Sequence, residues 1–259
     1  MNIVVLVKQV PDSGAERNLR SDDNTVDRAS ADNVINEMDE YAIEEALRIK
    51  ETHGGEVTIL TMGPERATES IRKALSMGPD KAVHVLDDAL HGSCAVATSK
   101  VLAAALRTLE ADLVLCGALS TDGGVQVMPH MLAERLGIAA LTGARKLMVD
   151  GSALTVERQT EEGYEVVTAT TPAVVSVWDT INEPRYPSFR GIMAAKKKPV
   201  QTLSLADLGV PPAEVGFDGA TSAVLEHSKR PPRSAGQKIT DEGSGGVALV
   251  EFLSSEKFV

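Results

Sequence analysis

The most constraining feature of this sequence is the alternation of short apolar runs with amphipathic segments over its first 137 residues. The apolar runs are continuous, which is typical of strands buried on both faces of a parallel sheet. Glycines close the helical segments that lie between them. This alternation predicts a doubly wound, mostly parallel α/β sheet with right-handed crossovers. The four strands are expected at 3–7, 57–60, 82–86 and 113–115.

The last of these units, Ala111 to Gly137, is the clearest candidate for a ligand site. Its strand ends at Gly117, a loop of small polar residues follows, and a helix is expected from about Val125. The first N–H groups of a helix have no internal partner, and with the helix dipole they favour a phosphate. Gly123 and Gly124 would let a ligand approach the backbone closely. The loop alone is equally compatible with an ordinary βα turn.

Ligands of doubly wound sheets bind beyond the carboxyl ends of the strands, where the strand order reverses. The loops after the first, second and fourth strands are therefore the expected site. These loops are Leu6–Lys8, Met62–Gly63 and Gly117–Met128, and the Asn36–Asp39 turn could join them.

The pattern changes after Gly137. Three segments resemble antiparallel strands, with Glu161–Gly163 as a hairpin turn, and Pro172–Trp178 reads as a further buried strand. A proline-rich stretch follows, in which Tyr186 and Phe189 are expected to be exposed. The three antiparallel segments are 147–149, 154–156 and 164–167.

The end of the chain is poor in residues that form a core. From Leu203 it is rich in Pro, Gly and Ser, with one weak helix expected at 247–253. Such a tail is either disordered or lies along another protein. The chain is therefore divided into an α/β domain, 1–200, and an extended C-terminal arm, 201–259.

Composition excludes several classes of function. The formal net charge of −11 argues against a nucleic-acid surface, and the only dense basic run is Lys196–Lys198. Cys94 and Cys116 have no metal-like spacing and are expected to be buried and inert, and the five histidines form no ligand pair, so no metal site is expected. No stretch is apolar enough to span a membrane and no targeting segment is visible, which predicts a soluble, cytoplasmic protein.

One stretch, Val156 to Ser176, carries a specific family pattern. An apolar residue is followed two positions later by a basic one. An acidic pair and glycine come next, then an acidic and an aliphatic residue, and finally a proline that leads into an aliphatic strand. On this pattern the sequence resembles the β subunit of electron transfer flavoprotein. The matching residues are Val156, Arg158, Glu161, Glu162, Gly163, Glu165, Val167, Pro172, Val174, Val175 and Ser176.

Further matches are VLVKQVPD, EEALRIKE, IRKALSMG, NEPRYPSF and IMAAKKKP. The resemblance covers the chain to about residue 210 and weakens in the tail, where PPRSAG still resembles the family. It implies a Rossmann-like fold of the adenine-nucleotide-binding type. It also implies an α/β heterodimer that carries electrons from flavin dehydrogenases, such as the acyl-CoA dehydrogenases of fatty acid β-oxidation, to a membrane quinone oxidoreductase or another acceptor.

In this family the redox FAD is shared with or held by the α subunit, and the β subunit binds a structural AMP without a catalytic site of its own. The resemblance also implies a partner-recognition loop, here at Tyr186, Phe189 and Ile192. Carried over by position, the AMP site comprises Leu6, Asn36, Asp39, Met62, Gly117, Ser120, Thr121, Asp122, Gly123, Gly124, Val125, Gln126, Val127 and Met128.

Two departures from the family pattern matter. Val127 and Met128 stand where relatives carry polar side chains, so phosphate contacts would rest on backbone N–H groups and on Gln126. Glu37 stands where relatives often have proline. The β subunits of electron-bifurcating members bind a second FAD in this site, and the sequence is compatible with that alternative.

A standalone nucleotide-binding protein or an ATP-using enzyme is the less favoured alternative. Related enzymes place a Ser-Gly-Gly-x-Asp-Ser loop after their first strand, where this chain has Lys8–Asp12, and the loop after the fourth strand lacks the Walker lysine. Helix capping and loop solvation are favoured over an acid/base role for Asp12, Asp39 and Asp122. A solvated face is expected for Arg17, Arg20 and Arg28.

Overall fold

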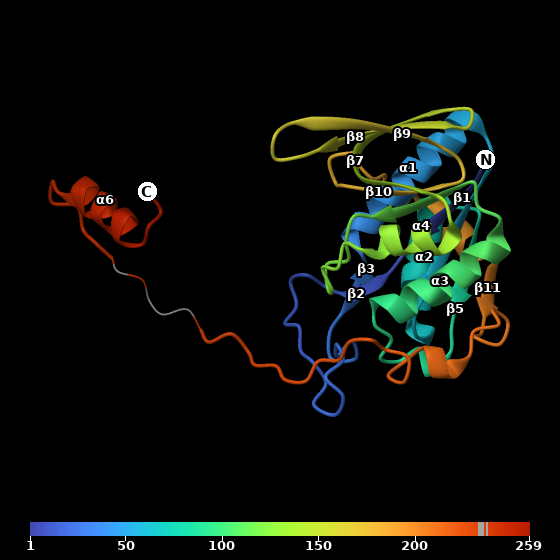
Figure 1. Cartoon of the computed structure of the whole chain (residues 1–259), viewed down its shortest axis with the longest axis horizontal. Coiled ribbons are helices and arrows are strands. Elements are labelled where there is room, and N and C mark those ends of the chain that lie inside the picture. The colour runs from blue at the N-terminus through green and yellow to red at the C-terminus, as the bar shows by residue number, and fades with distance from the viewer. Residues whose placement is uncertain (233–235, 237) are drawn as a thin grey trace. The chain divides into compact units, whose positions relative to one another are not determined.

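The computed structural model describes residues 1–232, 236 and 238–259, which form two compact units, Met1–Leu225 and Glu226–Val259 (Figure 1). Residues 233–235 of the PPRSAG run, together with Gln237, lie outside the described residues. The first unit extends well past residue 200, so the division expected at that residue falls inside it.

The first unit is built on a nine-stranded sheet of order β11-β5-β4-β1-β6-β10-β7-β8-β9. Every pairing from β11 to β7 is parallel, which confirms the predicted mostly parallel sheet. The parallel strands are β1 (Asn2–Leu6), β4 (Glu56–Met62), β5 (Lys81–Val85), β6 (Leu113–Gly117), β10 (Ala173–Val177) and β11 (Val200–Leu203).

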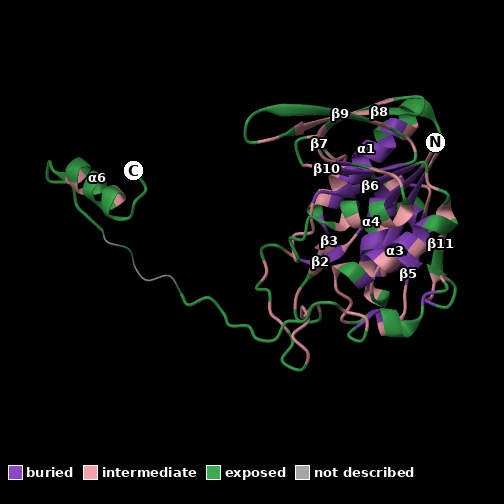
Figure 2. Ribbon diagram, viewed as in Figure 1, coloured by how far each residue is buried: buried purple, intermediate pink, exposed green. Residues whose placement is uncertain are grey.

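Two layers of helices cover the central strands, because a parallel strand is buried on both faces. One face of β1, with Ile3 and Val5, packs with α1 (Glu37–His53) and α2 (Thr68–Met77). The other face, with Val4 and Leu6, packs with α3 (Ala95–Leu109) and α4 (Met128–Leu136). Figure 2 shows the buried residues concentrated in this sandwich.

The strand order places β1 in the middle of the sheet. The chain first moves outward from β1 to β4 and β5, then returns to form β6 on the other side of β1. The order therefore reverses between β1 and β6, whose carboxyl ends are Leu6 and Gly117. Ligands of such sheets bind beyond this point.

The sheet continues as an antiparallel extension. β7 (Ala139–Asp150) pairs with two strands in turn. Its first part, up to Ala144, is parallel to β10, and its second part, from Ala144 on, is antiparallel to β8 (Ala153–Gln159). β9 (Tyr164–Thr170) completes the hairpin, as the sequence predicts. A second, small sheet of β2 (Gln9–Pro11) and β3 (Asn33–Ile35) is new, and Leu19 and Val26 form a bridge in the hairpin between them.

Three short 3-10 helices complete the first unit, at Glu65–Ala67, Asp88–Leu90 and Pro212–Glu214. The segment expected to be a loop around Phe189 is instead a short helix, α5 (Phe189–Ala195). The chain beyond β11 still packs on the unit, because Leu205, Val210 and Val215 are buried. In the second unit, the helix expected at 247–253 is present as α6 (Gly245–Ser255) and has no buried residue.

The expectation of two buried cysteines holds for Cys116 only. Cys94 is half-exposed at the N-cap position of α3. Burial acts to raise the pKa of its thiol, but hydrogen bonds involving Ala97 N–H and Thr221 outweigh it and lower the pKa to about 6. In the part of the chain that the structure describes, no three His, Cys, Asp or Glu side chains gather into a group that could hold a metal ion. Nor do the described residues include a helix long and apolar enough to cross a membrane.

Candidate functional site

Two buried side chains, Asn36 and Asp39, join the loops that leave β1 and β6. Asn36 is 1% exposed and Asp39 is 6% exposed. The Asp39 carboxylate accepts hydrogen bonds from Lys8 N–H at 2.8 Å and from Asn36 Nδ2 at 2.9 Å. Asn36 Nδ2 also donates to Leu119 O at 2.9 Å, and Asn36 Oδ1 accepts from Thr121 N–H at 3.0 Å. One amide and one carboxylate therefore fix the start of both loops.

Gly117 allows this close approach. A Cβ at that position would lie 2.6 Å from Met38 Cβ and 2.7 Å from Asp39 Oδ1, so no other residue fits without displacing α1. Burial raises the pKa of Asp39 to about 7, against the opposing effect of hydrogen bonds from Lys8 N–H, Asn36 and Gly117 N–H. The strand ends are thus held by a carboxyl group that titrates near neutral pH.

Asp122 gathers two cations over the loop after β6. Its carboxylate accepts from Lys8 Nζ at 2.7 Å and pairs with Arg28 Nη2 at 2.7 Å, and its side chain is 2% exposed. Lys8 Nζ also donates to Ser120 Oγ at 3.2 Å. Burial acts to raise the pKa of Asp122, but the charge and hydrogen bond of Lys8, with Ser120 and Arg28, lower it to about 2. Asp122 is therefore ionised at neutral pH.

The solvated face expected for Arg17, Arg20 and Arg28 is correct for the first two, which are exposed, and wrong for Arg28, which is half-buried. Arg20 pairs within the hairpin, with the exposed Asp22. Arg28 instead reaches Asp122, and Arg17 Nη1 donates to Thr121 O. The hairpin thus brings two guanidinium groups to the loop that the sequence analysis singled out.

The second half of that loop is exposed and presents its backbone to solvent. Gly123 to Val127 are all exposed, and Gly124 has φ +63°, a conformation that favours glycine. The helix begins at Met128 and not near Val125, because Pro129 occupies the first helical turn, where proline is favoured. Val127 therefore precedes the helix, and it is 41% exposed. Among the described residues, the N–H groups of 125–127 donate to no other protein group.

An apolar border completes the site. Leu6, Met62 and Met128, all predicted from the sequence, belong to one hydrophobic cluster on the α3 and α4 face of the sheet. Leu6 is buried, and the two methionines are half-buried. The structure thus brings the predicted residues into two groups, the polar cluster around Asp39 and Asp122 and this apolar border. The exposed loop 123–127 continues from the polar cluster.

Two charged side chains of the candidate site, Lys8 and Arg28, received no individual role from the sequence, although Lys8 ends the Leu6–Lys8 loop that was expected there. Lys8 directly follows β1, so its place at the carboxyl edge of the sheet is the signal that could have identified it. Arg28 offers no local signal, because only the folding of the hairpin brings it to Asp122, 94 residues further along the chain.

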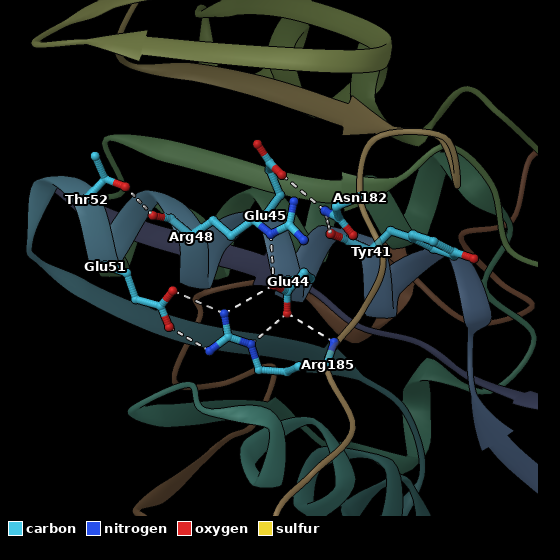
Figure 3. A network of polar contacts seen from close by, with 8 residues as sticks. All are labelled: Tyr41, Glu44, Glu45, Arg48, Glu51, Thr52, Asn182 and Arg185. Atoms are coloured by element: carbon cyan, nitrogen blue, oxygen red, sulfur yellow. Dashed lines mark hydrogen bonds and ion pairs between the residues drawn. The ribbon is translucent and has the colours of Figure 1, made fainter.

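The predicted recognition residues lie elsewhere, on and beside α5. Tyr186 is 94% exposed, Phe189 81% and Ile192 46%. The segment that carries them is fixed to α1 by a polar network (Figure 3). Arg185 Nε donates to Glu44 Oε2 at 2.7 Å, and Arg185 Nη1 pairs with Glu51 Oε1 at 2.6 Å.

Within the same network, Asn182 Nδ2 donates to Tyr41 O and to Glu45 Oε2, at 3.0 and 3.1 Å. Burial acts to raise the pKa of Glu44, but its bonds to Arg185 and Arg48 lower it. The exposed aromatic residues are thus carried by a segment whose start is held by ion pairs and hydrogen bonds.

Comparison with known proteins identifies the family of the chain. The model of the electron transfer flavoprotein domain matches residues 23–208. Three proteins named electron transfer flavoprotein subunit beta are similar over the full length of the chain. The one from Mycobacterium tuberculosis is 52% identical, covering 100% of this chain and 99% of the relative. The one from Mycobacterium leprae is 53% identical over the same shares, and the one from Thermoanaerobacterium thermosaccharolyticum is 38% identical over 100% of both.

The raised pKa of Asp39 generates a prediction about pH. Between about pH 4 and pH 7 the folded chain holds a proton on Asp39 that the unfolded chain has lost, so this group lowers stability as the pH rises. Asp39→Asn removes the titration. Its stability relative to the unchanged protein should therefore increase by about 2–3 kcal/mol from pH 5 to pH 8, measured by urea unfolding.

Asp122→Asn is the matched control. The folded pKa of Asp122, about 2, and its unfolded value both lie below pH 5, so the effect of this substitution should not vary from pH 5 to pH 8. If the stability difference between Asp39→Asn and the unchanged protein is equally constant from pH 5 to pH 8, the raised pKa of Asp39 is contradicted.

Proposed function

This chain belongs to the electron transfer flavoprotein subunit beta family, and we propose that it is the β subunit of a heterodimeric carrier that takes electrons from flavin dehydrogenases. The proposed donors include acyl-CoA dehydrogenases, and the acceptor is a membrane quinone oxidoreductase or another protein. The family carries electrons, and the proposal gives this chain no substrate of its own to turn over. FAD, held mainly by the α subunit, would supply the redox chemistry.

The role proposed for this chain is to bind AMP at the switch point of the sheet. The observation that carries this proposal is the exposed loop 123–127, which directly follows the Asp122 that holds Lys8 and Arg28, and whose N–H groups at 125–127 have no partner among the described residues. Free backbone N–H groups that precede a helix are a common phosphate site. The cations Lys8, Arg17 and Arg28 outnumber the carboxyl groups of the cluster, which are the ionised Asp122 and the partly ionised Asp39, so the cluster has a net positive charge that suits a phosphate.

The rest of the nucleotide has matching surfaces. The apolar border of Leu6 and Met62 would face the adenine ring, and the ribose would lie beside the loops that Asn36 and Asp39 hold. Asn36 and Asp39 already hold the loops in place, so the site is formed before the nucleotide binds. Its residues bind and orient the nucleotide and take no part in chemistry.

The C-terminal arm supports the proposal of an α-subunit partner. Within the second unit, Val247, Leu249, Val250 and Phe252 of α6 are 47–63% exposed. Several exposed apolar side chains on a helix that has no buried residue are typical of a surface that a partner covers. We propose that the arm packs on the α subunit.

The exposed aromatic residues support the proposed docking of dehydrogenases at α5. Phe189 is the first residue of the helix, and Ser188 Oγ caps that helix by accepting from Gly191 N–H at 3.0 Å. Large, well-placed aromatic side chains are typical binding hot spots. We propose Phe189 as the anchor, with Tyr186 and Ile192 beside it.

The dependence on a partner gives the first prediction of this section. Expressed without an α subunit, the chain should be unstable or poor in nucleotide, because the interface supplies part of the stability. Coexpression should restore both, measured by melting temperature and nucleotide content. A stable, flavin-loaded homodimer made without a partner would contradict the proposal.

The second prediction concerns the nucleotide. Mass spectrometry of the ligand extracted from the purified heterodimer should identify AMP, whereas FAD in this site would indicate the bifurcating alternative. Gly123→Val is the substitution of choice, because Gly124 has φ +63° and a β-branched residue there would strain the backbone. A Cβ at Gly123 meets only Ser120 Oγ at 3.4 Å and Lys8 Nζ at 3.9 Å, so the fold tolerates it.

The Gly123→Val side chain would occupy the path of the phosphate and should weaken AMP binding about tenfold, which corresponds to about 1.4 kcal/mol. The α-bound FAD spectrum should stay unchanged. Gly14→Val, at a loop glycine whose added Cβ meets only Asp12, is the control and should retain AMP. If both variants retain AMP equally, the AMP site lies elsewhere.

The third prediction concerns Phe189. Phe189→Ala should raise the KM of a dehydrogenase for this carrier by about 30-fold, which corresponds to the roughly 2 kcal/mol of a hot spot. FAD content and melting temperature should change little, because the ring is exposed. Val166→Ala, 65% exposed on β9, is the control. A lower melting temperature with normal docking kinetics would show that Phe189 is a structural residue.

A further inference from the structure

The helix that carries Phe189 is too short to be stable by itself. α5 has seven residues, whereas isolated helices shorter than about 12 residues are marginal in water. It has a single buried residue, Ala195. Contacts with the rest of the protein must therefore determine where α5 lies and in which direction Phe189 points.

Those contacts lie between α5 and α2, and they are reciprocal. Arg72 of α2 donates from Nη1 to Ala195 O at 2.8 Å and to Lys198 O at 2.9 Å, beyond the end of α5. Lys198 in turn donates from Nζ to Leu75 O at 3.0 Å and to Gly78 O at 3.1 Å, where α2 ends. Arg72, on α2, thus satisfies carbonyl groups at the end of α5. Lys198, which follows α5, satisfies carbonyl groups at the end of α2.

A third contact joins α5 and α2 at Gly191, two residues after Phe189. A Cβ at Gly191 would be 2.4 Å from Ser76 O, so α5 lies directly against the backbone of α2 at this position. Glycine permits this approach because it has no side chain. Three independent contacts thus hold a helix of two turns.

We infer that Arg72 and Lys198 are positioning residues, which fix α5 on α2 by capping the two helices reciprocally and so orient Phe189 for docking. This inference rests on the docking role proposed for Phe189 and extends it to residues that the partner does not touch. Neither cation needs to contact the dehydrogenase. Loss of either would leave Phe189 present but populate its docking orientation less often, and apparent affinity falls in proportion to that population.

The test uses the heterodimer purified with its α subunit and a flavin dehydrogenase as electron donor. Arg72→Ala should raise the KM for the carrier about fivefold and leave kcat and FAD content unchanged. Lys198→Met, which keeps the length of the side chain, should do the same. Lys73→Ala is the matched control, because Lys73 is the neighbouring cation on α2 and pairs with Glu40, with no bond to α5.

Combination with Phe189→Ala separates this inference from the proposed function. If Arg72 acts only through Phe189, the double variant Arg72→Ala/Phe189→Ala should have the KM of Phe189→Ala alone, within twofold. If the increase in KM of the double variant is instead the product of the two single increases, the inference is overturned. It is also overturned if Lys73→Ala raises KM as much as Arg72→Ala. If Phe189→Ala itself has no effect, the docking role fails first.

Hydrogen exchange gives a readout that does not depend on activity. In the free heterodimer, Arg72→Ala should speed exchange of the α5 amides at least tenfold and leave those of α1 unchanged. Gly191→Ala should have the same effect by forcing the two helices apart. Unchanged protection of the α5 amides in both variants would show that the contacts of Arg72, Lys198 and Gly191 with the other helix do not hold α5.

Discussion

The candidate nucleotide site depends on one buried carboxylate, Asp39. Two adjacent parallel strands end at the switch point, and the N–H groups that follow them need partners because they are buried. Asp39 accepts from Lys8 N–H after β1, and Gly117 N–H at the end of β6 also bonds to it. An apolar core residue could not satisfy these donors. The cost of burying the carboxyl group, seen in its raised pKa, is therefore offset by loops that leave the sheet in one defined arrangement.

The site also has to overcome the charge of the whole chain. A net charge of −11 repels a phosphate at long range, so short-range groups must supply the attraction. In the proposed site Lys8 and Arg28 would do so from two distant parts of the chain, and Asp122 holds both of them in place. Because Asp122 neutralises only one positive charge, the pair keeps an excess of one. The free N–H groups of the adjacent loop add to it without adding any side chain that could clash with the nucleotide.

The parallel sheet, the hairpin extension and most of the residues around the switch point could be predicted, because each follows from local periodicity and from strand ends that meet at one edge. Arg28 could not be predicted, because the hairpin that delivers it has no apolar pattern. α4 begins three residues later than the sequence predicts, because the polar loop resembles a helix start whereas Pro129 sets the true one. The same limit explains α5 and the segment after β11. The position of α5 comes from packing on α2, and that of the later segment comes from packing on the α3 face of the sheet, and neither follows from local composition.

Two surfaces proposed to meet partners differ in how they are prepared. The surface around Phe189 is held by ion pairs from Arg185 to α1 and by the hydrogen bonds of Arg72 and Lys198 between α2 and the end of α5. Docking of a partner on this surface would therefore require little ordering of the backbone. Breaking the Arg185 pair would leave Glu44 buried with one cation fewer, which makes that anchor hard to release. The second unit has no buried residue in α6 and would gain its packing only on contact with a subunit. A transient electron-transfer encounter favours the preformed surface, because each encounter would otherwise repeat the entropy loss of ordering. A permanent subunit contact incurs that loss once, which is why an arm without a core of its own suits the α-subunit interface and would not suit the docking site.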